Sequence, residues 1–204
     1  MHKYLLILSF IFGTAVYSAG QSHFEVHYLD KKMAIKDGET LLTDHVFTEI
    51  GPISEGLAWV NKGEWYAYLD TNLKERTSYK FTDVRDFKNG YAVVSLDSAF
   101  GIIDVKGKWI LPQQYDRITD VREGMACVLE GEKWGLYDLK GHWIIPPALS
   151  EIPVYRSRYL IMMKEEKWGA MTADGDMILE MKYDFITCNG EVFVDDKKIL
   201  IGLE

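Results

Sequence analysis

Cysteine and proline are scarce in this chain, and basic residues are outnumbered by acidic ones. Its 204 residues include 2 cysteines and 5 prolines, and 23 Lys or Arg stand against 31 Asp or Glu. Two cysteines exclude a small fold held together by a framework of disulfides. Without a Pro-rich or Ser-rich break we expect one domain over residues 20–204. The acidic balance argues against a nucleic-acid partner, because binding to phosphates needs a basic face.

Long apolar runs are also missing beyond the first residues. His2 and Lys3 precede an apolar run at 4–12, and small residues follow at Ala15, Ser18 and Ala19. This pattern predicts a signal peptide over residues 1–19, cleaved after Ser18 or Ala19. The alternative is a membrane anchor, but the run is shorter than the ~20 residues that span a bilayer. We therefore expect an exported protein without a stable membrane span, in the periplasm, at the cell surface or outside the cell.

Cleavage would change the charge and the redox setting of the chain. It removes Lys3 and no acid, so 22 basic against 31 acidic residues leave a formal charge of −9. Export makes a disulfide between Cys127 and Cys188 conceivable. The two cysteines occupy different positions of units that are not neighbours in sequence, whereas a bridge needs Cα atoms within about 7 Å. We favour a buried free thiol at Cys127 and leave the bridge open.

A period of 34 residues runs through most of the chain. It aligns an aromatic ring followed by a small residue, then a turn-forming residue three positions later, at Tyr66-Ala67 and Asp70, Phe100-Gly101 and Asp104, Trp134-Gly135 and Asp138, and Trp168-Gly169 and Thr172. A glycine recurs at Gly56, Gly90 and Gly124, where the next unit has Arg158. Agreement of several positions at one spacing predicts a tandem array. The full units are about 47–80, 81–114, 115–148 and 149–182, with partial units at both ends.

Short strands separated by glycine-containing turns fill one unit. In the third unit we expect strands at 117–121, 125–129, 133–138 and 142–145, with Pro146-Pro147 closing the unit because proline has no amide to donate. No segment sustains a helical period, so the fold class is all-β. The third strand is apolar on both faces, with Trp134 and Leu136 on one face and Tyr137 on the other, so we expect these side chains to be buried. Trp134 and its equivalents are expected to be the main core anchors, and Gly135 to let a neighbouring backbone approach closely.

These motifs resemble those of the WG-repeat family, also described as KWG repeats. The third unit carries them most fully, as Gly124, Ala126, Val128, Lys133-Trp134-Gly135, Asp138, Lys140-Gly141 and Ile144-Ile145-Pro146-Pro147. The second and fourth units carry Tyr115-Asp116 and Tyr183-Asp184. The resemblance implies an all-β bacterial repeat protein, commonly exported, that binds rather than catalyses.

The closure of such an array has two solutions. A propeller-like ring removes exposed edge strands, whereas an open β-solenoid must cover them with atypical end units. Both ends are atypical in this sequence, and we favour the ring while keeping the open stack as the alternative.

Catalytic and metal-binding patterns are not found in the sequence. His23 and His27 lie four residues apart without a helix or a carboxylate pair to make a metal site. Asp70, Asp104 and Asp138 repeat at one position of each unit, so we expect them to accept hydrogen bonds from turn amides. The sequence thus predicts no catalytic residue, no metal and no cofactor. An envelope hydrolase would need a convergent pair of acids or a histidine-containing cleft.

Two features are candidate contact surfaces, and the first of them departs from the repeat. The first is a basic and aromatic spot, made of Tyr155, Arg156, Arg158 and Tyr159, that could bind an acidic partner. The second is the pair Trp109 and Trp143, 34 residues apart, which could stack on sugar rings if exposed. The alternative for both is burial in the core. The predicted function is therefore an exported, non-enzymatic binding or interaction module with an unknown ligand, either a protein or a glycan. The alternative is a glycan-binding envelope protein that uses the tryptophans outside the main aromatic position.

Overall fold

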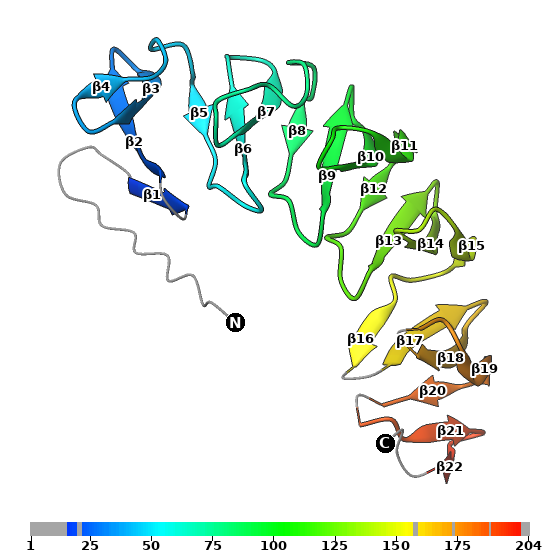
Figure 1. The fold of residues 1–204 in the computed structure, drawn as a ribbon. Coiled ribbons are helices and arrows are strands. Elements are labelled where there is room, and N and C mark those ends of the chain that lie inside the picture. Colours follow the sequence, from blue (N-terminus) through cyan, green and yellow to red (C-terminus); the bar gives the residue numbers. More distant parts are fainter. Residues whose placement is uncertain (1–15, 20–21, 157–158, 173, 188, 201–204) are drawn as a thin grey trace. The chain divides into compact units, whose positions relative to one another are not determined.

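The computed structural model describes residues 16–19, 22–156, 159–172, 174–187 and 189–200. Within these ranges the regular elements are all β-strands, as the period predicted (Figure 1). None of these residues forms an apolar helix long enough to cross a membrane. The chain divides into two compact units after Gln113. A single domain over 20–204 and a signal peptide over 1–19 both stay predictions.

The first unit holds three small antiparallel sheets in which the strands follow chain order or its reverse. The first sheet comprises β1 (Val16–Ala19), β2 (Ser22–Leu29), β3 (Lys32–Asp37) and β4 (Thr40–Leu41). The second comprises β5 (Glu49–Ile50), β6 (Leu57–Asn61) and β7 (Tyr66–Asp70). The third comprises β8 (Asp83–Val84), β9 (Tyr91–Leu96), β10 (Ala99–Asp104) and β11 (Trp109–Tyr115), which runs across the division.

The second unit repeats this construction. One sheet comprises β12 (Arg117–Ile118), β13 (Met125–Glu130), β14 (Lys133–Asp138) and β15 (Trp143–Leu149). The next comprises β16 (Val154–Arg156), β17 (Tyr159–Lys164), β18 (Lys167–Thr172) and β19 (Met177–Tyr183). The last comprises β20 (Phe185–Ile186), β21 (Val192–Val194) and β22 (Lys197–Leu200). The second and third strands predicted for the third repeat therefore match β13 and β14.

A two-residue turn explains the recurring glycine before the second strand of a sheet. Arg122 and Met125 exchange backbone hydrogen bonds of 2.9 Å in both directions. Between them Glu123 and Gly124 have φ of 50° and 73°. Two successive positive φ angles are typical of a type I′ hairpin, whose second position favours glycine. Arg158, which replaces this glycine in the fourth repeat, lies outside the described residues.

The prediction that the fourth strand of the third repeat ends at Ile145, before Pro146 and Pro147, is wrong. β15 continues through both prolines, since Ile145 pairs with Leu136 and Leu149 pairs with Trp134. Four residues of β15 thus oppose two of β14, which is a bulge, and β15 is the edge strand of its sheet. Prolines are tolerated at bulges and edges because no ladder amide is required there. The same irregularity recurs between β18 and β19.

Gly135 lies directly beneath this bulge. A Cβ atom at Gly135 would lie 2.6 Å from Cζ3 of Trp143 and 2.9 Å from both the carbonyl oxygen of Ile145 and the nitrogen of Pro147. These separations are shorter than van der Waals contact, so no side chain fits there. The expected close approach of a neighbouring backbone to the motif glycine is confirmed.

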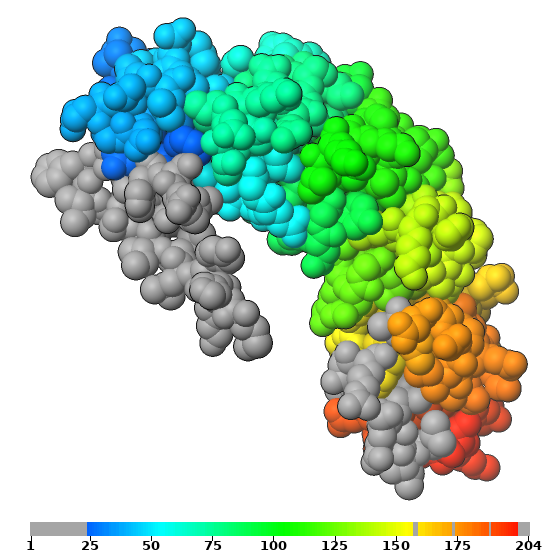
Figure 2. Space-filling model, viewed as in Figure 1, coloured from blue at the N-terminus to red at the C-terminus, as the bar shows by residue number. Residues whose placement is uncertain are grey.

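The core lies between neighbouring sheets of one unit. In the first unit Ile35 of the first sheet packs with Phe47, and with Val60 and Leu69 of the second sheet. Atoms of these successive sheets are in direct contact in the space-filling view (Figure 2). In the second unit Leu136 is in a cluster with Met125, Cys127, Leu149, Leu160, Met162 and Met171.

The residue two positions after the motif ring is the fully buried one. This corrects the prediction that the ring itself is the main anchor of the core. Trp134 and Trp168 are half-buried, whereas Leu136 and Tyr68 are fully buried. The reason is the alternation of the strand, in which the motif ring and the residue two places on share a face but the latter lies nearer the middle of the sheet. The motif ring therefore covers the edge of the core.

A half-buried ring still contributes to stability. Trp134 packs against the cluster around Leu136, so we expect Trp134→Ala to lower the free energy of unfolding by about 2 kcal/mol. A melt of the purified protein followed by circular dichroism measures this change. An unaltered midpoint would contradict the role of the ring in packing.

Candidate functional site

The repeated aspartates hold turns and are structural. Oδ1 of Asp138 accepts hydrogen bonds from the amides of Lys140 (3.0 Å) and His142 (2.7 Å). Asp70 and Asp104 accept equivalent pairs of amides two and four residues later, at Asn72, Lys74, Lys106 and Lys108. Each carboxylate therefore closes the turn that follows the third strand of its sheet. The expected hydrogen bonds to turn amides are confirmed.

These hydrogen bonds also set the protonation of two carboxyls. Burial alone would raise the pKa of Asp138, but the hydrogen bonds from His142 and Lys140 outweigh burial and lower the pKa below its ordinary value. For Asp70, burial is likewise outweighed by the amides of Lys74 and Asn72 and by the charge of Arg76. Both carboxylates are held ionised, since the turn amides donate to the charged form.

We expect Asp138→Ala to lower the free energy of unfolding by about 1 kcal/mol at neutral pH, because two turn amides lose their acceptor. The folded pKa is depressed, so this contribution is present above the unfolded pKa of about 3.9 and is lost as the pH falls through the folded pKa. Thermal melts of the wild type and the variant between about pH 3 and 7 measure the difference. Glu132→Ala, in an exposed turn, is the control. A difference that grows towards low pH would contradict the sign.

A second set of side chains caps the hairpins between the second and third strands. Oδ2 of Asp116 accepts from the amide of Gly131 at 2.6 Å, and Oγ of Ser150 accepts from the amide of Glu165 at 3.2 Å. Asp184 accepts from the amide of Asp195 at 2.7 Å. Asp116, Ser150 and Asp184 are 34 residues apart. The sequence analysis did not predict that these side chains cap hairpins, although an Asp or Ser that recurs before a short strand is the signal for this role.

Trp109 and Trp143 are half-buried and pack against other aromatic rings of the fold. The ring of Trp143 meets the edges of Tyr137 and Tyr115, with centroids 5.1 and 5.9 Å apart. Trp109 meets Phe81 with centroids 6.1 Å apart, and each indole lies over a strand glycine. Because part of each ring is covered from within the fold, neither indole is free on both faces to stack on a sugar. Their use in binding stays a prediction.

The basic and aromatic spot is distributed between the core and the surface. Tyr159 is 8% exposed, and Tyr155 is half-buried against the cluster around Leu136. The hydroxyl of Tyr155 donates to the carbonyl of Arg122 at 3.2 Å, and the Arg122 guanidinium lies 4.7 Å from the ring centre. Burial raises the pKa of Tyr155. Both tyrosines thus serve packing.

Of the two arginines of the spot, only Arg156 lies within the described residues. Arg156 donates from Nη1 to the carbonyl of Tyr155 at 3.2 Å, and its buried Nε lacks a hydrogen-bond partner in the part of the chain that is described. Arg158 lies outside the described residues. Arg156 is half-buried, and its use in a contact surface stays a prediction.

Histidines that are distant in sequence meet on the first sheet. Nδ1 of His27, on β2, and Nε2 of His45 are 2.7 Å apart and form a hydrogen bond. Ala34, which pairs with His27 across the strands, is fully buried. Sequence reasoning paired His27 with His23 and found no pattern that joins it to His45. Among the described residues no group of three or more His, Cys, Asp or Glu is placed to hold a metal ion.

Cys127 is a free, buried thiol, and burial raises its pKa to about 11 despite a hydrogen bond with Thr119. A thiol this weakly acidic is a poor nucleophile at neutral pH. Cys188 lies outside the described residues.

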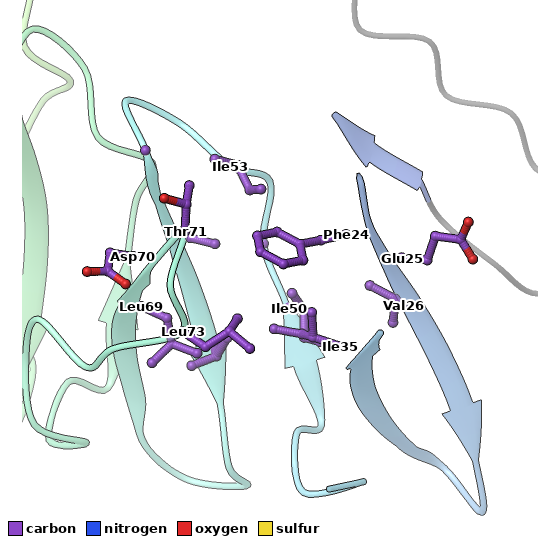
Figure 3. Close-up of a pocket in the computed structure, with 14 residues that line it drawn as sticks. Phe24, Glu25, Val26, Ile35, Ile50, Ile53, Leu69, Asp70, Thr71 and Leu73 are labelled. Carbon is purple, nitrogen blue, oxygen red and sulfur yellow. The ribbon is translucent and has the colours of Figure 1, made fainter. Parts of the chain in front are cut away.

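An apolar cavity of about 30 Å³ lies between the first and second sheets of the first unit. Its walls include Phe24, Ile35, Ile50, Ile53 and Leu73 (Figure 3). Figure 3 shows the ring of Phe24 projecting between the two sheets, while the carboxylate of Glu25 points away from them. The volume exceeds the ~15 Å³ that one water needs but is far below that of a pocket for a small organic ligand.

The strands and motifs define an all-β repeat protein built from small antiparallel sheets. A sequence profile of the WG-containing repeat matches residues 36–64, 66–98, 100–134 and 134–168, which is well over half of the chain. The chain therefore belongs to the family of proteins with WG-containing repeats. No curated protein matches its sequence.

Solved structures show a distant likeness. Hsv2 from Kluyveromyces lactis aligns with a TM-score of 0.43 and 12% identity, over 78% of this chain and 61% of that one. Hsv2 from Kluyveromyces marxianus aligns with a TM-score of 0.44 and 11% identity, over 78% of this chain and 62% of that one. The N-terminal domain of Nup159 aligns with a TM-score of 0.40 and 14% identity, over 87% of this chain and 63% of that one. This chain spans less than two thirds of each of these proteins, and family membership rests on the repeats alone.

Proposed function

We propose that this protein is an exported, non-enzymatic binding module whose repeats present a surface to another protein. The main support for the proposal is the structural role of the motif carboxylates. Asp70, Asp104 and Asp138 each accept hydrogen bonds from two turn amides. Groups engaged in this way build the fold and are not poised for acid–base chemistry. What varies between repeats, such as Arg156, is then available for recognition.

Export is supported by the apolar run at 4–12 and the small residues that follow it. N-terminal sequencing of the protein recovered from the cell envelope tests this directly. We expect the processed protein to begin at residue 19 or 20. An intact N-terminus in the cytoplasmic fraction would contradict export.

Binding is tested by affinity purification from envelope extract with the processed protein as bait. The matched bait carries Arg156→Ala and Arg158→Ala, and an unrelated acidic β protein controls for charge. We expect a partner enriched by the wild type and reduced with the variant. Recovery of the same proteins by all three baits would count against a specific interaction.

Closure of the array into a propeller-like ring is part of this proposal. It is supported by sheets of three or four antiparallel strands in chain order, which is how propeller blades are built. Small-angle scattering distinguishes the two forms, because an open stack of the same mass has a larger radius of gyration than a ring.

A further inference from the structure

The first sheet contains a strand that the proposed export would remove. β1 pairs with β2 in antiparallel register, Val16 opposite Glu25, Tyr17 opposite Phe24, Ser18 opposite His23 and Ala19 opposite Ser22 (Figure 1). β3 occupies the other side of β2, so β1 completes one edge of the sheet. Cleavage after Ser18 or Ala19 takes away all or nearly all of β1. The edge of β2 at 22–25 is then left without its partner.

This edge is longer than its equivalents elsewhere. β1 has four residues, whereas the first strands of three other sheets, β5, β8 and β12, have two each. A vacated edge of this length presents a row of unpaired amides and carbonyls, which favours pairing with another strand. The charge nearby is already neutralised, since Glu25 lies 3.0 Å from Nζ of Lys36. No unpaired charge at Glu25 therefore opposes a strand that docks there.

An apolar surface adjoins the same edge. Phe24 and Val26 of β2 line the cavity together with Ile50, Ile53 and Leu73 (Figure 3). Residues paired across strands share a face of the sheet, so a residue opposite Phe24 adds to this apolar wall. An incoming strand would thus gain main-chain hydrogen bonds along β2 and one apolar contact beside the cavity.

We propose that in the processed protein the vacated edge of β2 binds an extended segment of a partner protein as an added antiparallel strand, with an apolar or aromatic residue opposite Phe24. The chain's own β1 occupies this place before cleavage and fixes the register. Strand addition of this kind draws affinity from the backbone and selectivity from side-chain contacts. The inference rests on the proposed export, because cleavage is what vacates the edge.

The test uses the protein recovered after export and the unprocessed full chain. The probe is a fluorescent synthetic peptide of residues 14–21 with capped ends, and binding is measured by fluorescence anisotropy. We expect saturable binding to the processed protein and at least 100-fold weaker binding to the full chain, in which the tethered β1 competes at an effective concentration in the millimolar range.

Two altered peptides separate strand pairing from non-specific adhesion. A peptide with N-methyl groups on alternate amides cannot pair along one edge, and a peptide with Tyr17→Asp places a charge opposite Phe24. Each should bind the processed protein at least 10-fold more weakly. A circular-dichroism spectrum of the processed protein checks that it remains folded without β1.

Equal binding to both forms of the protein, undiminished binding of the N-methylated peptide, or no saturable binding would overturn the proposal. Light scattering adds one more outcome. A processed protein that is dimeric and excludes the peptide, beside a monomeric full chain, would make the occupant a second copy and refute a partner segment. Failure of export shows separately as an uncleaved N-terminus, whereas failure of this inference shows as a cleaved protein that does not bind the peptide.

Discussion

Gly135→Ala is expected to lower the free energy of unfolding by about 3 kcal/mol. The added Cβ meets Cζ3 of Trp143 at 2.6 Å, and it meets the backbone of Ile145 and Pro147 at 2.9 Å. A side chain can rotate away, but the backbone of the bulge cannot move without breaking the pairs on either side of it. Urea unfolding of the purified protein, followed by tryptophan fluorescence, measures the loss.

Two further variants identify the cause. Gly131→Asn is the control, because a Cβ there meets nothing within 4 Å and asparagine tolerates its φ of 60°. Adding Trp143→Leu to Gly135→Ala should fail to restore stability, since the contacts with the bulge remain. Full recovery in the double variant would show that the indole, not the bulge, requires glycine.

Leu136→Ala is expected to cost about 3 kcal/mol, within the range for truncation of a buried leucine. Leu136 is 0% exposed and is in the cluster that joins the two largest sheets of the second unit, where it packs among Cys127, Leu160 and Met162. Alanine removes three carbons from a site enclosed on both faces, so a cavity remains. Denaturant midpoints at constant slope measure the change.

The control on the same strand is Lys133→Ala, which is exposed and should change stability by no more than about 0.5 kcal/mol. Comparison with Trp134→Ala decides which residue anchors the strand. A smaller loss for Leu136→Ala than for Trp134→Ala would reinstate the motif ring as the main anchor.

The period predicted the strands because it reports two constraints at once. Gly124 recurs where a hairpin needs positive φ, and Asp138 recurs where a turn needs an acceptor for two amides. Both requirements are local, so a single sequence is enough to see them. This is why β13 and β14 match the predicted strands within one residue.

Pairings that are not local were missed or misjudged. Pro146 looked like a terminator because proline cannot donate, but whether a strand is at an edge is decided by the sheet around it. Likewise His27 and His45 meet only because β3 brings their segments side by side. No period joins those two histidines, since His27 lies on the atypical first sheet and His45 in the segment that follows it.

The basic and aromatic spot was identified from a departure from the repeat, and this criterion is ambiguous. Tyr155 departs from the pattern, yet its ring is used for packing and its hydroxyl caps the carbonyl of Arg122. A substitution that breaks a repeat can therefore adjust the fit of neighbouring sheets as readily as it creates a contact. Side-chain burial separates these possibilities, and sequence alone does not supply it.

Each sheet is formed by strands that are consecutive in the chain. This has a consequence for how such chains can change in length. Loss or duplication of one whole 34-residue segment leaves every remaining ladder with its own partners. Insertion of a single residue inside a strand such as β14 instead turns the inward side chains outward from that point. Genetic variation in this protein should accordingly be tolerated in whole multiples of its period and selected against in between.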